Sequence, residues 1–342
     1  MKDRLLRAVA VRSLVLGMAA LIVSGPATGQ DSTVLVATGS SVPAPLYNRW
    51  AQEYNQQNGH VRFKYLPTGT QEGINDISHG SGDFGAGEVP LSAKDRELGL
   101  TELPVALVGI VPVYNVSGVK SGLHLSGEVL AGIFLGDIKA WNAPAVAKLN
   151  PDVSLPATAI RVVHRPDGKG SNYIFTDFLS KTSAKFRTRV GTTPSPKWPV
   201  GESAERSSDM ADKVGHEDGA IGYVELAYAV KSGLSQAAVL NPAGKFVRAS
   251  AATITAACRE SAHGDKLSAS MTNAPGEDSY PIASFTWAYV RTSNSDGART
   301  PAIADFFRWV FSDGQKFAEE EGYPPLPEQL LESARGKVKE IR

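Results

Sequence analysis

The chain has a single cysteine, Cys258, among 342 residues, which excludes an intramolecular disulfide framework. Lys and Arg total 35 and Asp and Glu total 35, so there is no basic excess of the kind that favours a nucleic-acid partner. No stretch is apolar over the roughly 20 residues that a membrane-spanning helix needs. Any anion binding must therefore come from local geometry, because the surface as a whole is not basic.

The N-terminus carries a different signal. Basic residues precede a short apolar run at 14–23, and the small residues Ala27 and Gly29 follow it. This pattern is typical of a cleavable secretory signal peptide, predicted here over 1–29. Cys258 is far from the cut, so we expect no lipid anchor there. The expected product is a secreted, soluble protein.

Short apolar runs alternate with amphipathic stretches along the rest of the chain, as in α/β proteins. Residues 34–37 and 61–65 read as strands, each followed by a helical pattern. Residues 103–114 and 284–290 are nearly continuous apolar runs, typical of strands buried on both faces. We take these two runs as crossings between two lobes, each a mixed sheet flanked by helices, with a ligand cleft at the hinge.

The predicted division of the chain follows from these crossings. After the signal peptide come the first part of lobe 1, then lobe 2, then a return to lobe 1 with C-terminal helices. The expected boundaries are 30–112, 113–279 and 280–342.

Three places share one local pattern, in which a strand runs into glycine with serine or threonine and then into a helix. They are Gly39-Ser40-Ser41, Thr68-Gly69-Thr70 and Gly168-Lys169-Gly170-Ser171. Glycine permits close approach of the backbone, and a helix N-terminus offers unpaired N–H groups at its positive end. Each is a candidate anion site. The alternative is that the hydroxyls are ordinary N-caps.

Two charged residues accompany these turns. Arg165 precedes the third turn, where its guanidinium could grip an oxyanion through two parallel hydrogen bonds, and Asp167 could hold it in place. Glu88 should repel an anion unless the anion carries a proton, as hydrogen phosphate does and sulfate does not. The alternatives are a surface salt bridge for Arg165 and a solvated loop carboxylate for Glu88.

Other patterns in the sequence do not indicate a nucleotide, metal or catalytic site. The GxGxxG match at 80–85 is not followed directly by a helix, and the GKGS run at 168–171 lacks the upstream glycine of a phosphate-binding loop. The histidines show no metal-ligand spacing and no serine sits in a GxSxG turn. We expect no metal, no cofactor and no enzymatic activity. A secreted phosphatase using Ser41 or Ser171 would lack a paired base.

The chain resembles the PstS family, the phosphate-binding proteins of bacterial phosphate importers, along nearly its whole mature length. The resemblance is carried by six blocks in one order, at 38–54, 83–91, 130–142, 165–181, 197–201 and 219–230. It implies the two-lobed, type II-like fold of periplasmic binding proteins and a periplasmic monomer. It also implies capture of inorganic phosphate in the cleft and delivery to the permease subunits of an ABC-type importer. A binder of another tetrahedral oxyanion, such as sulfate, molybdate or a phosphonate, is the alternative.

The resemblance also implies the residues that bind phosphate, which are Ser41, Val42, Thr70, Glu88, Arg165, Lys169, Gly170 and Ser171. Five of these depart from the family pattern, which commonly has threonine and phenylalanine where Ser41 and Val42 stand and serine where Thr70 stands. The other two departures affect the charge and the room of the site. The family commonly has aspartate where Glu88 stands and serine where Lys169 stands. The longer acid and the added lysine change the charge of the site, and affinity and selectivity over sulfate depend on both.

Overall fold

The computed structural model describes residues 32–119, 122–261, 270–292 and 299–341. The signal peptide predicted over 1–29 lies outside these residues. Within them, no helix is long and apolar enough to cross a membrane. The predicted α/β class is confirmed, since strands and helices alternate along the chain.

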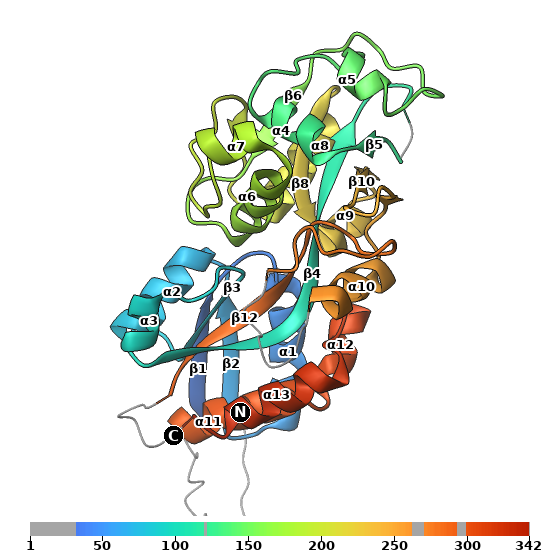
Figure 1. The fold of residues 1–342 in the computed structure, drawn as a ribbon. Coiled ribbons are helices and arrows are strands. Elements are labelled where there is room, and N and C mark those ends of the chain that lie inside the picture. Colours follow the sequence, from blue (N-terminus) through green and yellow to red (C-terminus); the bar gives the residue numbers. More distant parts are fainter. Residues whose placement is uncertain (1–31, 120–121, 262–269, 293–298, 342) are drawn as a thin grey trace, which may run out of the picture. The chain divides into compact units, whose positions relative to one another are not determined.

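One long strand organises the fold. Strand β4 (Leu100–Asn115) is buried along nearly all of its 16 residues. As far as Gly109 it pairs antiparallel with β12 (Ala283–Arg291), and from Ile110 onward it pairs antiparallel with β8 (Ala220–Glu225). The change of partner joins two groups of strands into one mixed sheet (Figure 1). The predicted strands at 103–114 and 284–290 are thus β4 and β12. Strand β4 pairs with strands of both groups, whereas β12 pairs with β3 and with the first part of β4, so the prediction that 284–290 crosses between the lobes is wrong.

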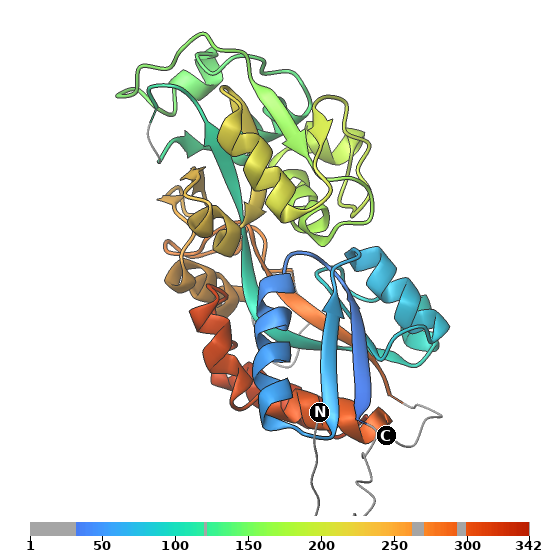
Figure 2. The same ribbon diagram turned by 180° about the vertical axis from the view of Figure 1, so that it is seen from behind.

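The first group of strands, here called the first lobe, has the order β2, β1, β3, β12, β4. Strand β1 pairs in parallel with β2 and with β3. From behind, α1 is seen packed along this group, with α11 and α13 below it (Figure 2). Its further elements are β1 (Thr33–Gly39), β2 (Val61–Leu66), β3 (Phe84–Gly87), α1 (Ala44–Gln57), α2 (Thr70–His79), α3 (Ala93–Glu97), α11 (Arg299–Val310), α12 (Gly314–Glu320) and α13 (Glu328–Val338).

The second group, the second lobe, continues the sheet from β4 through β8 and β6 to β7, and β9 pairs with the far end of β4. A small separate sheet has the order β11, β10, β5. The elements are β6 (Arg161–His164), β7 (Glu202–Ser203), β9 (Ser235–Gln236), β5 (His124–Leu125), β10 (Ala238–Leu240), β11 (Phe246–Val247), α4 (Gly127–Phe134), α5 (Pro144–Ala147), α6 (Gly170–Thr182), α7 (Ala184–Arg189), α8 (Ser207–His216) and α9 (Leu226–Lys231). Helix α10 (Ala251–Ser261) lies against β4 and β12, where the two groups of strands join (Figure 1).

Aromatic side chains fill the core of the first lobe. Tyr47 of α1 stacks on Tyr65 of β2 with ring centroids 4.6 Å apart, and Phe63 contacts Phe306 of α11 at 4.4 Å. Burying each such ring contributes about 2 kcal/mol or more from lost apolar surface. This packing fixes α1 against β2, and so fixes the turn between β1 and α1.

That turn depends on Gly39. Its φ of 151° lies where residues with a Cβ are strained, and a Cβ built there would lie 2.0 Å from the carbonyl oxygen of Ala86 on β3. The neighbouring Ser40 N–H donates to the same carbonyl at 2.9 Å. The close approach of β1 to β3 therefore requires glycine at the end of β1.

Replacing Gly39 tests whether the approach of β1 to β3 requires glycine. Gly39→Ala should lower the free energy of unfolding by more than about 2 kcal/mol, because the clash is with backbone and not with a flexible side chain. Urea denaturation measures the change. Gly59→Ala is the matched control, since a Cβ there meets nothing within 4 Å, and it should change stability by less than about 1 kcal/mol. Equal effects from the two variants would contradict the argument.

Candidate functional site

The three predicted turns each lead into a helix. Helix α1 begins at Ala44, α2 at Thr70 and α6 at Gly170, and none of the three has a side-chain hydrogen bond at its N-cap. By contrast, serine side chains cap α4 and α7. The interpretation that the hydroxyls of the three turns are ordinary N-caps is therefore wrong. The N-termini of these helices therefore lack a side-chain cap, and the N–H groups of Val42 and Gln71 near them donate to Ser40 Oγ and Gly168 O.

Arg165, directly after β6, joins the turns. It is only 1% exposed, so the alternative of a surface salt bridge is wrong. Its Nη2 donates to Ser41 Oγ at 3.1 Å, and its Nη1 donates to Ser207 Oγ at 3.1 Å. Two carbonyls fix the rest of the guanidinium, with Nε donating to Ala204 O at 2.9 Å and Nη2 to Glu205 O at 2.7 Å. The guanidinium of the second lobe thus reaches the first turn of the first lobe.

Asp167 does not hold Arg165, contrary to the expectation from the sequence. Its carboxylate pairs with Lys197 at 3.0 Å, and both side chains are more than half exposed. The residues between Arg165 and α6 direct Asp167 to solvent, while the guanidinium turns inward toward the loop before α8. Carbonyl oxygens at 204 and 205 take the role that the sequence suggested for this carboxylate.

Glu88 follows β3 and is completely buried, so the alternative of a solvated loop carboxylate is also wrong. Thr70 donates to its Oε2 and Thr286 to its Oε1, each at 3.2 Å. Burial raises the pKa of Glu88 to about 7, against the opposing hydroxyls of Ser40, Thr70 and Thr286 and the charge of Arg165. A carboxyl with this pKa can accept a proton or give one up near neutral pH.

Gly170 brings the third turn against this carboxylate. A Cβ at Gly170 would lie 1.8 Å from Glu88 Oε2 and 2.6 Å from Thr70 Oγ1, so glycine alone allows the approach. The N–H of Gln71 on α2 also donates to Gly168 O at 3.1 Å. The starts of α2 and α6 therefore meet directly at Glu88.

The remaining predicted residues differ in their partners. Ser171 is buried, and its Oγ has no hydrogen-bond partner among the residues described. The Val42 N–H donates to Ser40 Oγ at 3.1 Å. Lys169 donates to Glu205 Oε1 at 2.5 Å and, across the lobes, to Thr68 O at 3.5 Å. Its charge is thus matched by Glu205 at the edge of the site.

Two residues at the site were not predicted from the sequence. The Ser207 hydroxyl, at the start of α8, lies between Arg165 and Ser41, 3.3 Å from the Ser41 hydroxyl. Glu225 ends β8 and is completely buried. The one available signal for Glu225 was a carboxylate closing an otherwise apolar strand, within the block at 219–230.

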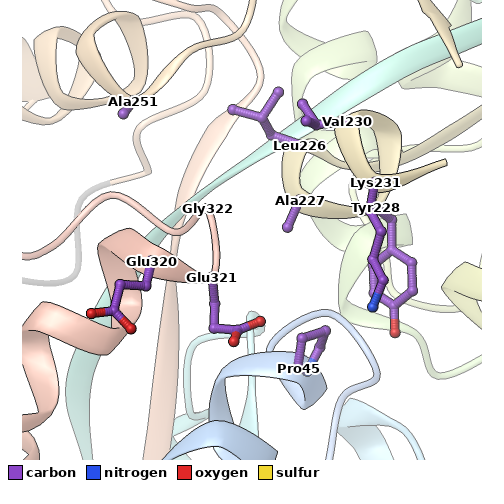
Figure 3. A pocket seen from close by; sticks show the side chains of 10 residues that line it. All are labelled: Pro45, Leu226, Ala227, Tyr228, Val230, Lys231, Ala251, Glu320, Glu321 and Gly322. Carbon is purple, nitrogen blue, oxygen red and sulfur yellow. The ribbon is translucent and has the colours of Figure 1, made fainter. Parts of the chain in front are cut away.

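Two hollows are lined by residues of the site or of the helices next to it. One of about 30 Å³, the size of one water molecule, borders Glu88, Tyr173 and Trp287. A larger one of about 430 Å³ separates α9 from the end of α12 (Figure 3). Leu226 and Val230 form its apolar side, and Glu320 and Glu321 face it from α12 and the turn that follows. Lys231 also lines this hollow, and Glu320 pairs with Arg49 at 3.2 Å.

No three His, Cys, Asp or Glu side chains of the described ranges are grouped so that they could hold a metal ion. The site is built from hydroxyls, helix N-termini, one guanidinium and buried carboxyls. These groups suit a small oxyanion that carries at least one proton.

Comparison with known proteins agrees with this chemistry. A model of the PBP superfamily domain matches residues 25–314. The phosphate-binding protein PstS of Xylella fastidiosa (strain 9a5c) is 37% identical over 311 residues, which cover 90% of this chain and 85% of that protein. The PstS of Pasteurella multocida (strain Pm70) is 37% identical over 326 residues, 94% of each chain.

Solved structures show the same fold. A putative phosphate ABC transporter substrate-binding protein with bound phosphate from Clostridium perfringens has a TM-score of 0.65 at 18% identity, covering 86% of this chain and 100% of that one. This likeness confirms the predicted two-lobed fold of periplasmic binding proteins. Since its sequence relatives align along nearly the whole chain, the protein belongs to the PstS family of phosphate-binding proteins.

Proposed function

We propose that this protein captures inorganic phosphate between its two lobes and delivers it to the permease of an ABC-type importer. The observation that carries the proposal is the buried Arg165, which reaches from the second lobe to Ser41 of the first. An oxyanion held between the lobes would take over the two guanidinium donors that Ser41 and Ser207 now accept. The PstS names of the sequence relatives support phosphate as that anion.

The proposed ligands of phosphate are those named from the sequence. The hydroxyls of Ser41, Thr70 and Ser171 and the N–H groups of Val42 and Gly170 would donate to phosphate oxygens, together with Arg165. Micromolar affinity needs about 8 kcal/mol, and hydrogen bonds to charged groups contribute about 1.5 to 3 kcal/mol each. Several such donors therefore suffice even after the cost of ordering the site. Lys169, paired with Glu205, would act at the edge of the site through its charge.

Glu88 would select for phosphate. Its carboxylate can accept a hydrogen bond from the P–OH group of hydrogen phosphate, whereas sulfate has no such hydrogen and would face an unpaired buried charge. The binding would involve no chemistry on the ligand. Ser171 Oγ has no base bonded to it among the residues described, which argues against a phosphatase that uses this serine.

Several other features belong to the proposal. The protein would be exported by the signal peptide at 1–29, would act as a periplasmic monomer without a lipid anchor, and would use no cofactor. The proposed lobe boundaries are 30–112, 113–279 and 280–342, and the switch of β4 partners at 109 and 110 supports a hinge near the first of them.

Removing the guanidinium tests the proposal. Arg165→Ala should weaken phosphate binding by at least about a hundredfold, because two charge-assisted hydrogen bonds are lost. Calorimetry measures the affinity, and circular dichroism checks that the variant is folded. Arg161→Ala is the control, because this arginine, on the strand just before Arg165, is 62% exposed and pairs with Glu217. Unchanged affinity in Arg165→Ala would remove this residue from the site, and wild-type protein that does not bind phosphate would refute the proposed function.

The role of Glu88 has its own test. Glu88→Gln should reduce the preference for phosphate over sulfate by about tenfold or more, since the amide can donate to sulfate and carries no charge. Competition titrations at constant ionic strength measure the ratio of affinities. The exposed Glu332→Gln on α13 is the control and should leave the ratio unchanged. A preference that survives in Glu88→Gln would show that selectivity arises elsewhere.

A further inference from the structure

Glu225 is a buried carboxylate that the proposed binding site does not use. It closes β8 opposite Ile110, one residue beyond the point where β4 changes partner. Its side chain is completely buried, and neither carboxylate oxygen has a hydrogen-bond partner in the described part of the chain. A buried carboxylate without donors is expensive unless a cation is near or a proton is bound.

The nearby cation is Arg165. Burial lowers the pKa of this guanidinium, and among the charges that oppose the shift, that of Glu225 acts most strongly. Asp167 is turned away to Lys197, and Glu205 gives its carboxylate to Lys169. Asp209, another acid that acts on Arg165, pairs with Arg206, and the buried Glu88 accepts hydrogen bonds from Thr70 and Thr286. Glu225 is thus the buried carboxyl near Arg165 that has no such partners.

The other groups around Glu225 are Glu88 beyond β3, Tyr223 of its own strand, Tyr228 of α9, Tyr323 after α12 and the Ser207 hydroxyl of α8. The charge of Arg206 also acts on Tyr228, and this arginine is paired with Asp209 at 3.1 Å. The three tyrosines all have a raised pKa and stay neutral over the working range of pH. Ser207 is close as well, although its hydrogen-bond geometry joins it to Arg165 and Ser41.

The two buried carboxyls therefore differ in their surroundings. Glu88 receives hydrogen bonds from Thr70 and Thr286, which stabilise its ionised form. Neither oxygen of Glu225 has a partner in hydrogen-bonding geometry, and burial raises its pKa to about 8 against its own backbone N–H, the charge of Arg165 and the nearby Ser207 hydroxyl. When a dianion takes over the guanidinium, two carboxylates and two phosphate charges would face one Arg165, and the repulsion is relieved most easily by a proton on the carboxyl without donors.

We propose that Glu225 is the counter-ion of Arg165 before phosphate binds and takes up a proton from the buffer when phosphate replaces it. This inference rests on the proposed function. Glu225 would be a positioning residue, acting on phosphate through Arg165. In consequence, the affinity for phosphate should fall as the pH rises above the range in which the free carboxyl ionises, because more of the protein must then be protonated on binding.

Calorimetry in buffers of different ionisation enthalpy counts the protons taken up. At about pH 8.5, wild-type protein should take up about three quarters of a proton per phosphate bound, because a carboxyl with a pKa near 8 is then about one quarter protonated beforehand. Glu225→Gln should take up almost none. Glu88→Gln should keep most of the uptake, and so should the control Glu217→Gln, whose carboxylate pairs with the exposed Arg161.

The pH dependence of affinity gives a second readout. The ratio of the wild-type Kd to the Glu225→Gln Kd should rise about tenfold for each pH unit above about 8.5, since every binding event in the wild type needs one more proton. A purely structural role for Glu225 would change both affinities by a constant factor and leave this ratio flat.

If Glu225→Gln does not fold, infrared difference spectra of wild-type and Glu88→Gln protein replace it. Adding phosphate at about pH 8.5 should produce the C=O band of a protonated carboxylic acid in both proteins. Absence of that band, or equal proton uptake by wild type and Glu225→Gln, would overturn the inference while leaving phosphate binding intact. Failure of the wild type to bind phosphate at all would instead refute the proposed function.

Discussion

The burial of one guanidinium is the constraint on which the site depends. Arg165 is removed from water, so each of its N–H groups needs an acceptor and its charge needs an anion. The carbonyls of Ala204 and Glu205 fix its orientation, and Ser207 and Ser41 take the donors that face the first lobe. The loop before α8 and the turn after β1 are both arranged around this one side chain.

Much of the fold could be predicted from local pattern. The strands expected at 34–37 and 61–65 are β1 and β2, and the apolar runs at 103–114 and 284–290 are β4 and β12. Continuous burial leaves a clear trace in the sequence because every position of such a strand is apolar. The change of partner within β4 leaves none, since a strand buried against β12 reads the same as one buried against β8.

The site was predictable where the residues lie next to helix starts. The sequence predicted that Ser41, Thr70, Arg165 and the turn at 168–171 converge. In the structure Ser41 accepts a hydrogen bond from Arg165, and Thr70 and Gly170 meet at Glu88. The partners that come from distant segments were not predictable. Ser207 and Glu225 lie 42 and 60 residues after Arg165, and nothing local to either position points to the guanidinium. The predicted pairing of Asp167 with Arg165 was wrong for the opposite reason. The two residues are close in sequence, but the Asp167 side chain points to solvent and pairs with Lys197.

The continuity of β4 has a mechanical consequence. A narrow ribbon of paired strands resists stretching and sliding along its length, because these motions break its hydrogen bonds in register, whereas twisting and bending deform them only slightly. Since a single unbroken strand serves as a member of both halves of the sheet, relative displacement of the halves by translation would be stiff and rotation would be soft. Motion between the two halves should therefore be rotation about β4 and not sliding of one half along the other.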